Sequence, residues 1–166
     1  MFRRVADFQE TWRQEREGTL KLLGALDDPS LSQSAGADHR TLGRLAWHLT
    51  TTLSEMMDRT GLKVAGPAHD SPVPAAAATI VSAYDAASRS VADQVSAWTD
   101  AMLEVEDDMY GERWPRGRTL QALVSHQAHH RGQMTVLMRL AGRNVTGVYG
   151  PSREEWAAYG MPAPSV

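Results

Sequence analysis

Apolar residues recur every three or four positions over four long segments of this chain, and this spacing constrains its fold more than any other feature. Such spacing puts one apolar stripe on each helix. A half-buried sheet would need strict alternation of apolar and polar residues, which no stretch of the chain shows. The expected helices are residues 2–26, 38–60, 74–103 and 119–141. Four amphipathic helices joined by loops of modest length predict an all-α four-helix bundle.

Proline, glycine and a capping pattern mark the ends of these segments. Pro29 follows the first helix, and proline can neither donate to a helix nor favour one in the residue before it. Gly61 lies just beyond the second helix, where a left-handed residue commonly ends a helix. The connection at residues 105–115 is expected to be irregular, with a short extended piece. After the fourth helix, Ser152 and Glu155 have the spacing of a capping box, which predicts a short extra C-terminal helix.

Length and composition restrict the class of protein. With 166 residues, 42% of them hydrophobic, the chain can fill one core, so residues 1–166 are expected to form a single domain. No apolar run is long enough to span a bilayer, and the N-terminus turns charged at Arg3 and Arg4, so we expect a cytoplasmic protein without a membrane partner. The net charge is -3 and the basic residues are mixed with acids, which argues against nucleic acid as a partner.

Two histidines, His126 and His130, lie four residues apart in the fourth predicted helix. Residues with this spacing are stacked on one helix face, about 5.4 Å apart along the axis, so both rings can reach a single metal ion. Two imidazoles facing the interior would be costly to bury without partners or a metal. His48, in the apolar second helix, offers a third ligand, although a lone histidine there is more often a hydrogen-bonded core residue. Three neutral imidazoles plus an open position are typical of a catalytic zinc-type site.

The chain contains no cysteine, so any metal must be held by nitrogen and oxygen ligands, and no thiolate of the protein itself can take part in a reaction.

Three further residues are candidates for a catalytic role near these histidines. His129 is expected beside the metal-binding face, although its spacing from His126 is also compatible with ligation. Gln133 lies on the same stripe as the histidine pair and could orient a ligand or a substrate. Glu55 lies two turns after His48 and, like His129, could accept a proton from an activated water. The plainer interpretation of Gln133 and Glu55 is solvated helix surface.

Three segments, taken in order, form the most specific pattern in the chain: His48 in a helix beginning near Arg40, an H-x-x-H-H-R-G-Q run at residues 126–133, and the residues 148–156. Together they resemble the DinB-like family, also called DinB/YfiT, over most of the chain. The resemblance implies a four-helix bundle with an unusual connection order, commonly dimeric. It also implies that one histidine of the second helix and two of the fourth bind a divalent metal such as zinc or nickel. Those ligands are His48, His126 and His130.

The resemblance also suggests a reaction, because relatives act as thiol-dependent S-transferases or as a mycothiol-dependent isomerase. We therefore expect a metal-dependent transferase that binds a low-molecular-weight thiol at the open position, lowers its pKa and presents the thiolate to an electrophilic small-molecule substrate. One alternative is a hydrolase that activates water. Another is a non-catalytic metal or small-ligand binding protein of the stress response. A well-formed pocket beside the cation would favour an enzyme, and a closed coordination shell would favour the binding protein.

Surplus apolar residues on the first and third helices predict a homodimer. The first helix adds Phe2 beside Val5 and Trp12, more than one inward stripe requires. The third has alanine on nearly every face in residues 75–87. Small side chains allow close approach of two subunits, so we expect a symmetric dimer through these helices.

Overall fold

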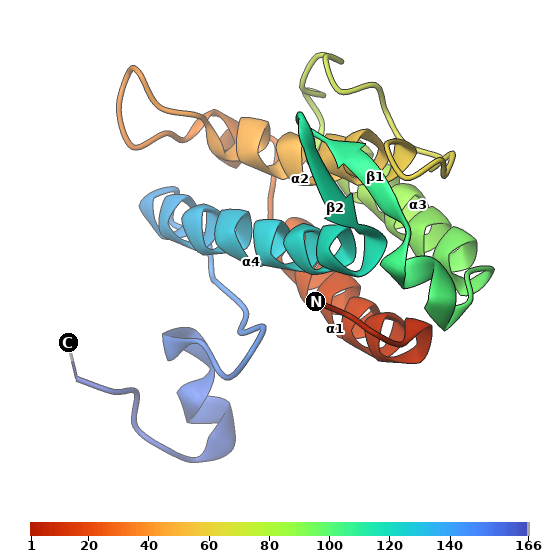
Figure 1. Ribbon diagram of the computed structural model, residues 1–166. Helices are drawn as coiled ribbons and strands as arrows, with labels where there is room; N and C mark the ends of the chain where they lie inside the picture. The colour runs from red at the N-terminus through yellow and green to blue at the C-terminus, as the bar shows by residue number, and fades with distance from the viewer. Residues whose placement is uncertain (166) are drawn as a thin grey trace.

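Four α-helices lie side by side along the molecule, which confirms the predicted all-α bundle (Figure 1). The computed structural model describes residues 1–165. The α-helices are α1 (Val5–Gly24), α2 (Leu42–Asp58), α3 (Ala77–Ser96) and α4 (Arg116–Leu140). The short elements are the 3-10 helices η1 (Pro29–Ser32), η2 (Asp100–Glu104) and η3 (Arg153–Tyr159), and the strands β1 (Glu106–Met109) and β2 (Glu112–Pro115). None of the helices within residues 1–165 combines the length and the apolar character needed to cross a membrane.

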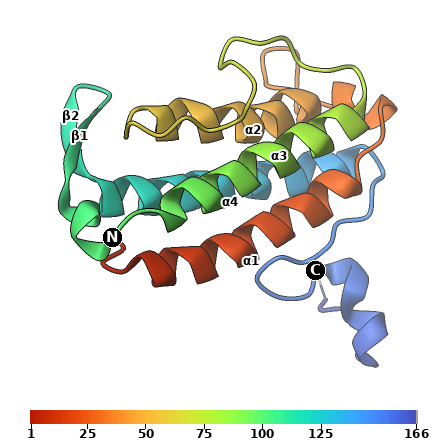
Figure 2. The ribbon, with the colours of Figure 1, turned by 90° about the vertical axis from the view of Figure 1, so that its right-hand side faces the viewer.

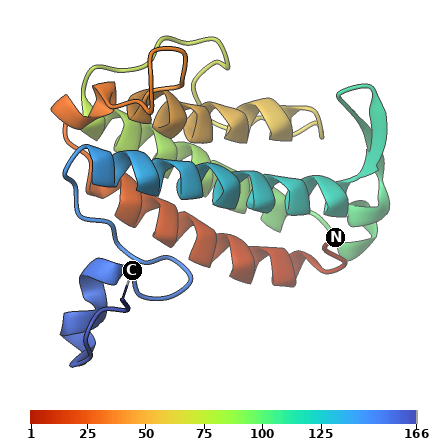
Figure 3. The ribbon, with the colours of Figure 1, turned by 90° about the vertical axis from the view of Figure 1, so that its left-hand side faces the viewer.

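The order of the helices around the bundle differs from their order along the chain. Helix α1 packs against α3 and α4, and α2 packs against the same two helices, so the consecutive helices α1 and α2 lie across the bundle from each other (Figures 2 and 3). This is the unusual connection order that the resemblance implied. Its consequence for the site is that α2 lies directly beside α4, although residues 59–115 separate them in the sequence.

The apolar stripes of the four helices meet in a core that runs along the bundle. Phe8 and Trp12 of α1 stack with ring centroids 5.7 Å apart, and the indole N–H of Trp12 donates to the carbonyl of Ser88 in α3, 2.9 Å away. Tyr84 is fully buried on the predicted stripe of α3. Since each fully buried large apolar side chain contributes about 1.5–3 kcal/mol, this core supplies most of the stability of the fold.

Local caps and contacts between distant segments set the helix ends, which the sequence pattern misplaces. Helix α1 begins later than predicted because residues before it are extended, with the N–H of Phe2 donating to the carbonyl of Gly117, 3.1 Å away. Helix α2 also begins later, because the hydroxyl of Thr41 caps it by accepting the N–H of Arg44 at 3.1 Å. Helix α3 ends early at Ser96, and part of the segment predicted to extend it forms η2. Helix α4 begins earlier than predicted, directly after the hairpin.

The connection before α4 is more regular than predicted. Strands β1 and β2 pair in an antiparallel hairpin at one end of the bundle (Figures 2 and 3). Its two turn residues, Tyr110 and Gly111, have φ values of 61° and 85°, as a type I′ turn requires. An ion pair of 2.8 Å between Asp107 and Arg116 fixes the hairpin on the first turn of α4.

The predicted C-terminal helix is a 3-10 helix, η3, beside the end of the bundle away from the hairpin (Figure 2). The capping carboxylate of Glu155 accepts the backbone N–H groups of Ser152 and Gly147, both at 2.8 Å. The same carboxylate therefore fixes both the start of η3 and the loop that precedes it.

The apolar side chains near the start of α1 that suggested a homodimer pack within one chain. Trp12 is buried, and Phe2 and Val5 are partly buried against the same core. The outer surface of α1 carries ion pairs, such as those of Arg13 with Glu10 at 2.8 Å and Glu17 at 3.1 Å. Hence Phe2, Val5 and Trp12 no longer indicate surplus apolar surface on α1, and the homodimer stays a prediction.

Candidate metal centre

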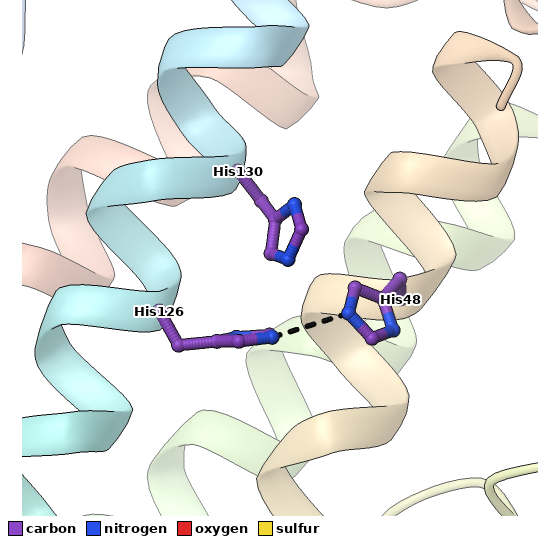
Figure 4. Close-up of side chains that lie close together, drawn as sticks. All are labelled: His48, His126 and His130. Carbon is purple, nitrogen blue, oxygen red and sulfur yellow. Dashed lines mark hydrogen bonds between the residues drawn. The ribbon is translucent and has the colours of Figure 1, made fainter. Parts of the chain in front are cut away.

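Three imidazole rings meet between α2 and α4, where the sequence predicted a metal site (Figure 4). His126 and His130 come from successive turns of α4 and point toward His48 of α2. The Nε2 atoms of His48 and His126 lie 3.1 Å apart. One nitrogen from each of the three rings lies within 4.8 Å of those of the others.

These distances fit a divalent cation. Zinc binds imidazole nitrogen at about 2.0–2.1 Å in tetrahedral geometry, which places two such nitrogens about 3.3 Å apart. The separation of 3.1 Å between His48 and His126 is close to that value. The three histidines could therefore hold a metal ion.

The electrostatic surroundings keep the three rings neutral. Burial lowers the pKa of His48 to about 3, and repulsion from the other two imidazoles acts in the same direction. Burial likewise lowers the pKa of His126 to about 4, with a further contribution from His130. The pKa of His130 is also lowered, again mainly by burial. Because a histidine must be neutral to bind a metal, the rings are in the competent protonation state at neutral pH.

Gln133 lies where it can orient one of the ligands. Its Oε1 is 2.7 Å from Nδ1 of His130, which makes Nδ1–H the donor and leaves Nε2 of that ring with a free lone pair. Such a hydrogen bond to the second ring nitrogen is the usual way in which proteins fix the tautomer and direction of a metal-binding histidine.

His129 lies outside the cluster of three. Its side chain is exposed, with its ring centroid 4.9 Å from that of His130, and its Nε2 is 3.3 Å from Nε2 of Gln133. The structure thus brings His130, rather than His129, together with His48 and His126. His39 and His69, both exposed, are not part of the cluster either.

Glu55 lies toward the hairpin and is held by two partners. The hydroxyl of Tyr110 donates to its Oε2 at 2.7 Å, and Nε of Arg59 lies 3.1 Å from its Oε1. Burial and the Glu55 charge raise the pKa of Tyr110. Through space, the same carboxylate raises the pKa of His126 and so opposes the larger effect of burial. Glu55 is therefore an electrostatic neighbour of the centre whose oxygens already accept hydrogen bonds.

A cavity of about 430 Å³ adjoins the centre on the side of the N-terminal end of α2. It is lined by Ala35, His39, Arg40, Leu45, His130, Gln133, Val136 and Leu137. Its volume is within the range of small-molecule sites, about 300–1,000 Å³. Since His130 is part of its wall, a molecule in this cavity can reach the centre.

A buried polar network next to the centre was missed by the sequence analysis. The guanidinium of Arg131 pairs with the carboxylate of Glu15 and donates to Thr19 Oγ1 at 2.8 Å, which joins α4 to α1. The hydroxyl of Tyr149 donates to Glu15 Oε1, also at 2.8 Å. One signal was available, because Glu15 falls on the apolar stripe of α1, where an acid needs a partner.

Gln127 forms a second buried link from α4. Its Nε2 donates to the carbonyl of Leu49 at 3.0 Å, and its Oε1 accepts from the hydroxyl of Tyr84 at 3.2 Å. Gln127, the residue directly after His126, thus joins α4 to α2 and α3.

Comparison with known proteins identifies the family of this chain and agrees with its fold. The sequence model of the DinB family matches residues 1–164. The chain belongs to the DinB family. It is 42% identical over 167 residues to the uncharacterized protein YrdA of Bacillus subtilis (strain 168), and the alignment covers the whole of both chains.

Two solved DinB-like structures share the fold of this family member. A DinB-like protein from Bacillus cereus ATCC 10987 has a TM-score of 0.82 and 44% identity, over 90% of this chain and 100% of that one. The DinB-like protein YjoA from Bacillus subtilis has a TM-score of 0.68 and 15% identity, over 88% and 99% of the two chains. The second likeness concerns the fold alone.

Proposed function

We propose that this DinB-family protein is a metal-dependent enzyme that transfers a low-molecular-weight thiol to an electrophilic substrate. The observation that carries the proposal is the junction of two features: three neutral imidazoles that converge on one point, and a cavity of about 430 Å³ whose wall includes one of them, His130. A centre used only for storage or structure would need no such cavity.

The donor set supports a catalytic metal rather than a structural one. Three nitrogen ligands leave a fourth tetrahedral position for a substrate, whereas structural sites are closed by four protein ligands. A bound zinc or nickel ion would lower the pKa of a thiol at that position and stabilise the thiolate. Because the chain contains no cysteine, the thiol must come from outside.

The protein's own residues would prepare the site for that thiol. Gln133 accepts the Nδ1 proton of His130 and holds the ring with Nε2 free. Burial keeps all three imidazoles unprotonated. Leu45 and Leu137 form an apolar part of the cavity wall and limit the access of water to the reacting groups.

Cobalt substitution tests the proposal. Glutathione, coenzyme A, bacillithiol and mycothiol are each added to the cobalt-loaded protein, and one of them is expected to change the ligand-field spectrum as sulfur enters the first shell. That thiol should then be consumed with a generic electrophile such as a chloro-dinitro-arene or an epoxide. His48→Ala, His126→Ala and His130→Ala should each abolish turnover, while His129→Ala, the matched control, should retain it.

The same experiment separates the alternatives. If no thiol perturbs the spectrum and none is consumed, the transferase is refuted, and ester and amide hydrolysis is the next activity to assay, with Glu55 as the candidate base. A spectrum that responds to no small ligand indicates a saturated shell and therefore a non-catalytic metal-binding protein. Circular dichroism of each variant verifies that the bundle is intact.

A further inference from the structure

Arg40 brings an uncompensated positive charge to the cavity beside the three histidines. It lines the cavity at the residue before the Thr41 cap of α2. Within residues 1–165, no carboxylate lies within ion-pair distance of its guanidinium, and its side chain makes no hydrogen bond, whereas Arg59 and Arg116 at the hairpin end of the bundle are both paired.

Apart from His39, His130 and Gln133, the rest of the cavity wall is apolar. Leu45 and Leu137 are almost fully buried in its wall, and Val136 lies at a more exposed position. No acidic residue is among those that line it. An apolar wall with one unpaired guanidinium is the arrangement expected for a ligand with an apolar body and an anionic end, because guanidinium pairs with carboxylate through two parallel hydrogen bonds.

We propose that this cavity binds an organic carboxylate with an apolar body, the carboxylate pairing with Arg40 while the reactive end faces the three histidines. The proposal rests on the proposed function, because it names the chemical class of one reactant at the same site.

Direct binding to the metal-free protein tests the anion site independently of any metal chemistry. The probe is 4-phenylbutyrate, compared with the uncharged amide 4-phenylbutanamide of the same shape, and both are titrated while the protein is followed by NMR. The acid is expected to bind at least tenfold more tightly than the amide. Arg40→Gln should remove this preference and leave the affinity for the amide unchanged.

Arg44→Gln is the matched control. Arg44 carries the same charge, is exposed one turn further along α2 and does not line the cavity. This variant should therefore keep the preference for the acid. Val136→Trp, at an exposed position of the cavity wall, should weaken the binding of both probes. Equal affinities for acid and amide in the wild type, or equal losses of the preference in the two arginine variants, would overturn the proposal.

Either reactant, the thiol or the electrophile, could carry the carboxylate, and the cobalt-loaded protein distinguishes them. The probes are 6-mercaptohexanoate and the uncharged 6-mercaptohexan-1-ol. If the thiol carries the carboxylate, the acid should produce the sulfur-to-cobalt band at a lower concentration than the alcohol does, and Arg40→Gln should remove this difference. A carboxylate on the electrophile predicts equal bands for both thiols and retained binding of 4-phenylbutyrate beside them. If no thiol changes the cobalt spectrum but the acid still binds more tightly than the amide, the thiol chemistry is refuted and the carboxylate site is retained, because that site is measured without metal.

Discussion

Replacing Glu15 with leucine should lower the free energy of unfolding by about 3–5 kcal/mol, because the change leaves the charge of Arg131 buried without a counter-ion. The side chains of Glu15 and Arg131 are only 5% and 3% exposed, so water cannot take the place of the lost carboxylate. The remaining partners of the guanidinium, namely Thr19 Oγ1, the carbonyl of residue 15 and the hydroxyl of Tyr149, are neutral. For a chain of this size, 1 kcal/mol corresponds to about 2–4 °C in melting temperature, so a fall of roughly 6–20 °C is expected.

The assay is urea unfolding followed by circular dichroism, with calorimetry for the melting temperature. The double variant Glu15→Leu with Arg131→Met is the control, since it removes both charges and replaces them with apolar groups of similar volume. It should recover most of the stability, because a buried ion pair contributes little relative to apolar packing. If the single and double variants were equally unstable, the cost would come from altered packing rather than from an unpaired charge, and the reasoning would be refuted.

Four further results are expected. The protein should bind close to one zinc or nickel ion per chain, measured by elemental analysis of untagged protein, and the His130→Ala variant should lose this ion. Unchanged stoichiometry in that variant would indicate that His129 is the ligand or that there is no site. Gln133→Leu should weaken metal binding about 10–100-fold in competition with a chromophoric chelator, because His130 loses the acceptor that orients it; equal affinity would exclude an orienting role. The metal-free protein should lose stability as the pH falls from 6.5 toward 4, as measured by urea unfolding. The folded state lowers the pKa values of His48 and His126 to about 3 and 4, so the unfolded chain takes up protons at a higher pH than the folded one. Each histidine then reduces the free energy of unfolding by at most about 1.4 kcal/mol per pH unit. A flat profile, or one unchanged in His48→Ala, would contradict this. Light scattering at micromolar concentration should give the mass of a dimer, and the mass of a monomer would refute the predicted homodimer.

The helical pattern predicted the four helices because each stripe is a local property of a segment, repeated every three or four residues. The helix ends were predicted less well, since they depend on partners elsewhere in the chain. Phe2, for example, is kept out of α1 by its hydrogen bond to Gly117, more than a hundred residues away. The hairpin was seen only as an extended piece because its strands are short and carry no apolar alternation.

The site was predictable in the part that one helix determines. The spacing of His126 and His130 alone puts both on one face of α4, and the structure brings them together with His48. The contribution of Arg40 was not predictable, because it depends on how the loop before α2 lies over the C-terminal half of α4. Nor does periodicity give the partner of a buried charge, so the pair of Glu15 and Arg131 had no direct sequence signature.

The H-x-x-H-H-R-G-Q run combines candidate metal ligands with the packing that positions them. His126 and His130, at the first and fifth places of the run, face the centre. Each is followed directly by a residue that points into the bundle and bonds to a neighbouring helix, Gln127 after the first and Arg131 after the second. Each candidate ligand is thus followed by a buried polar residue that fixes the rotation of α4 about its own axis. A rotation of one residue, about 100°, would take both histidines from the centre and unpair both buried groups at once. The cost of that double loss holds the rings of His126 and His130 in place, so a site built from only two helices keeps its three imidazoles together.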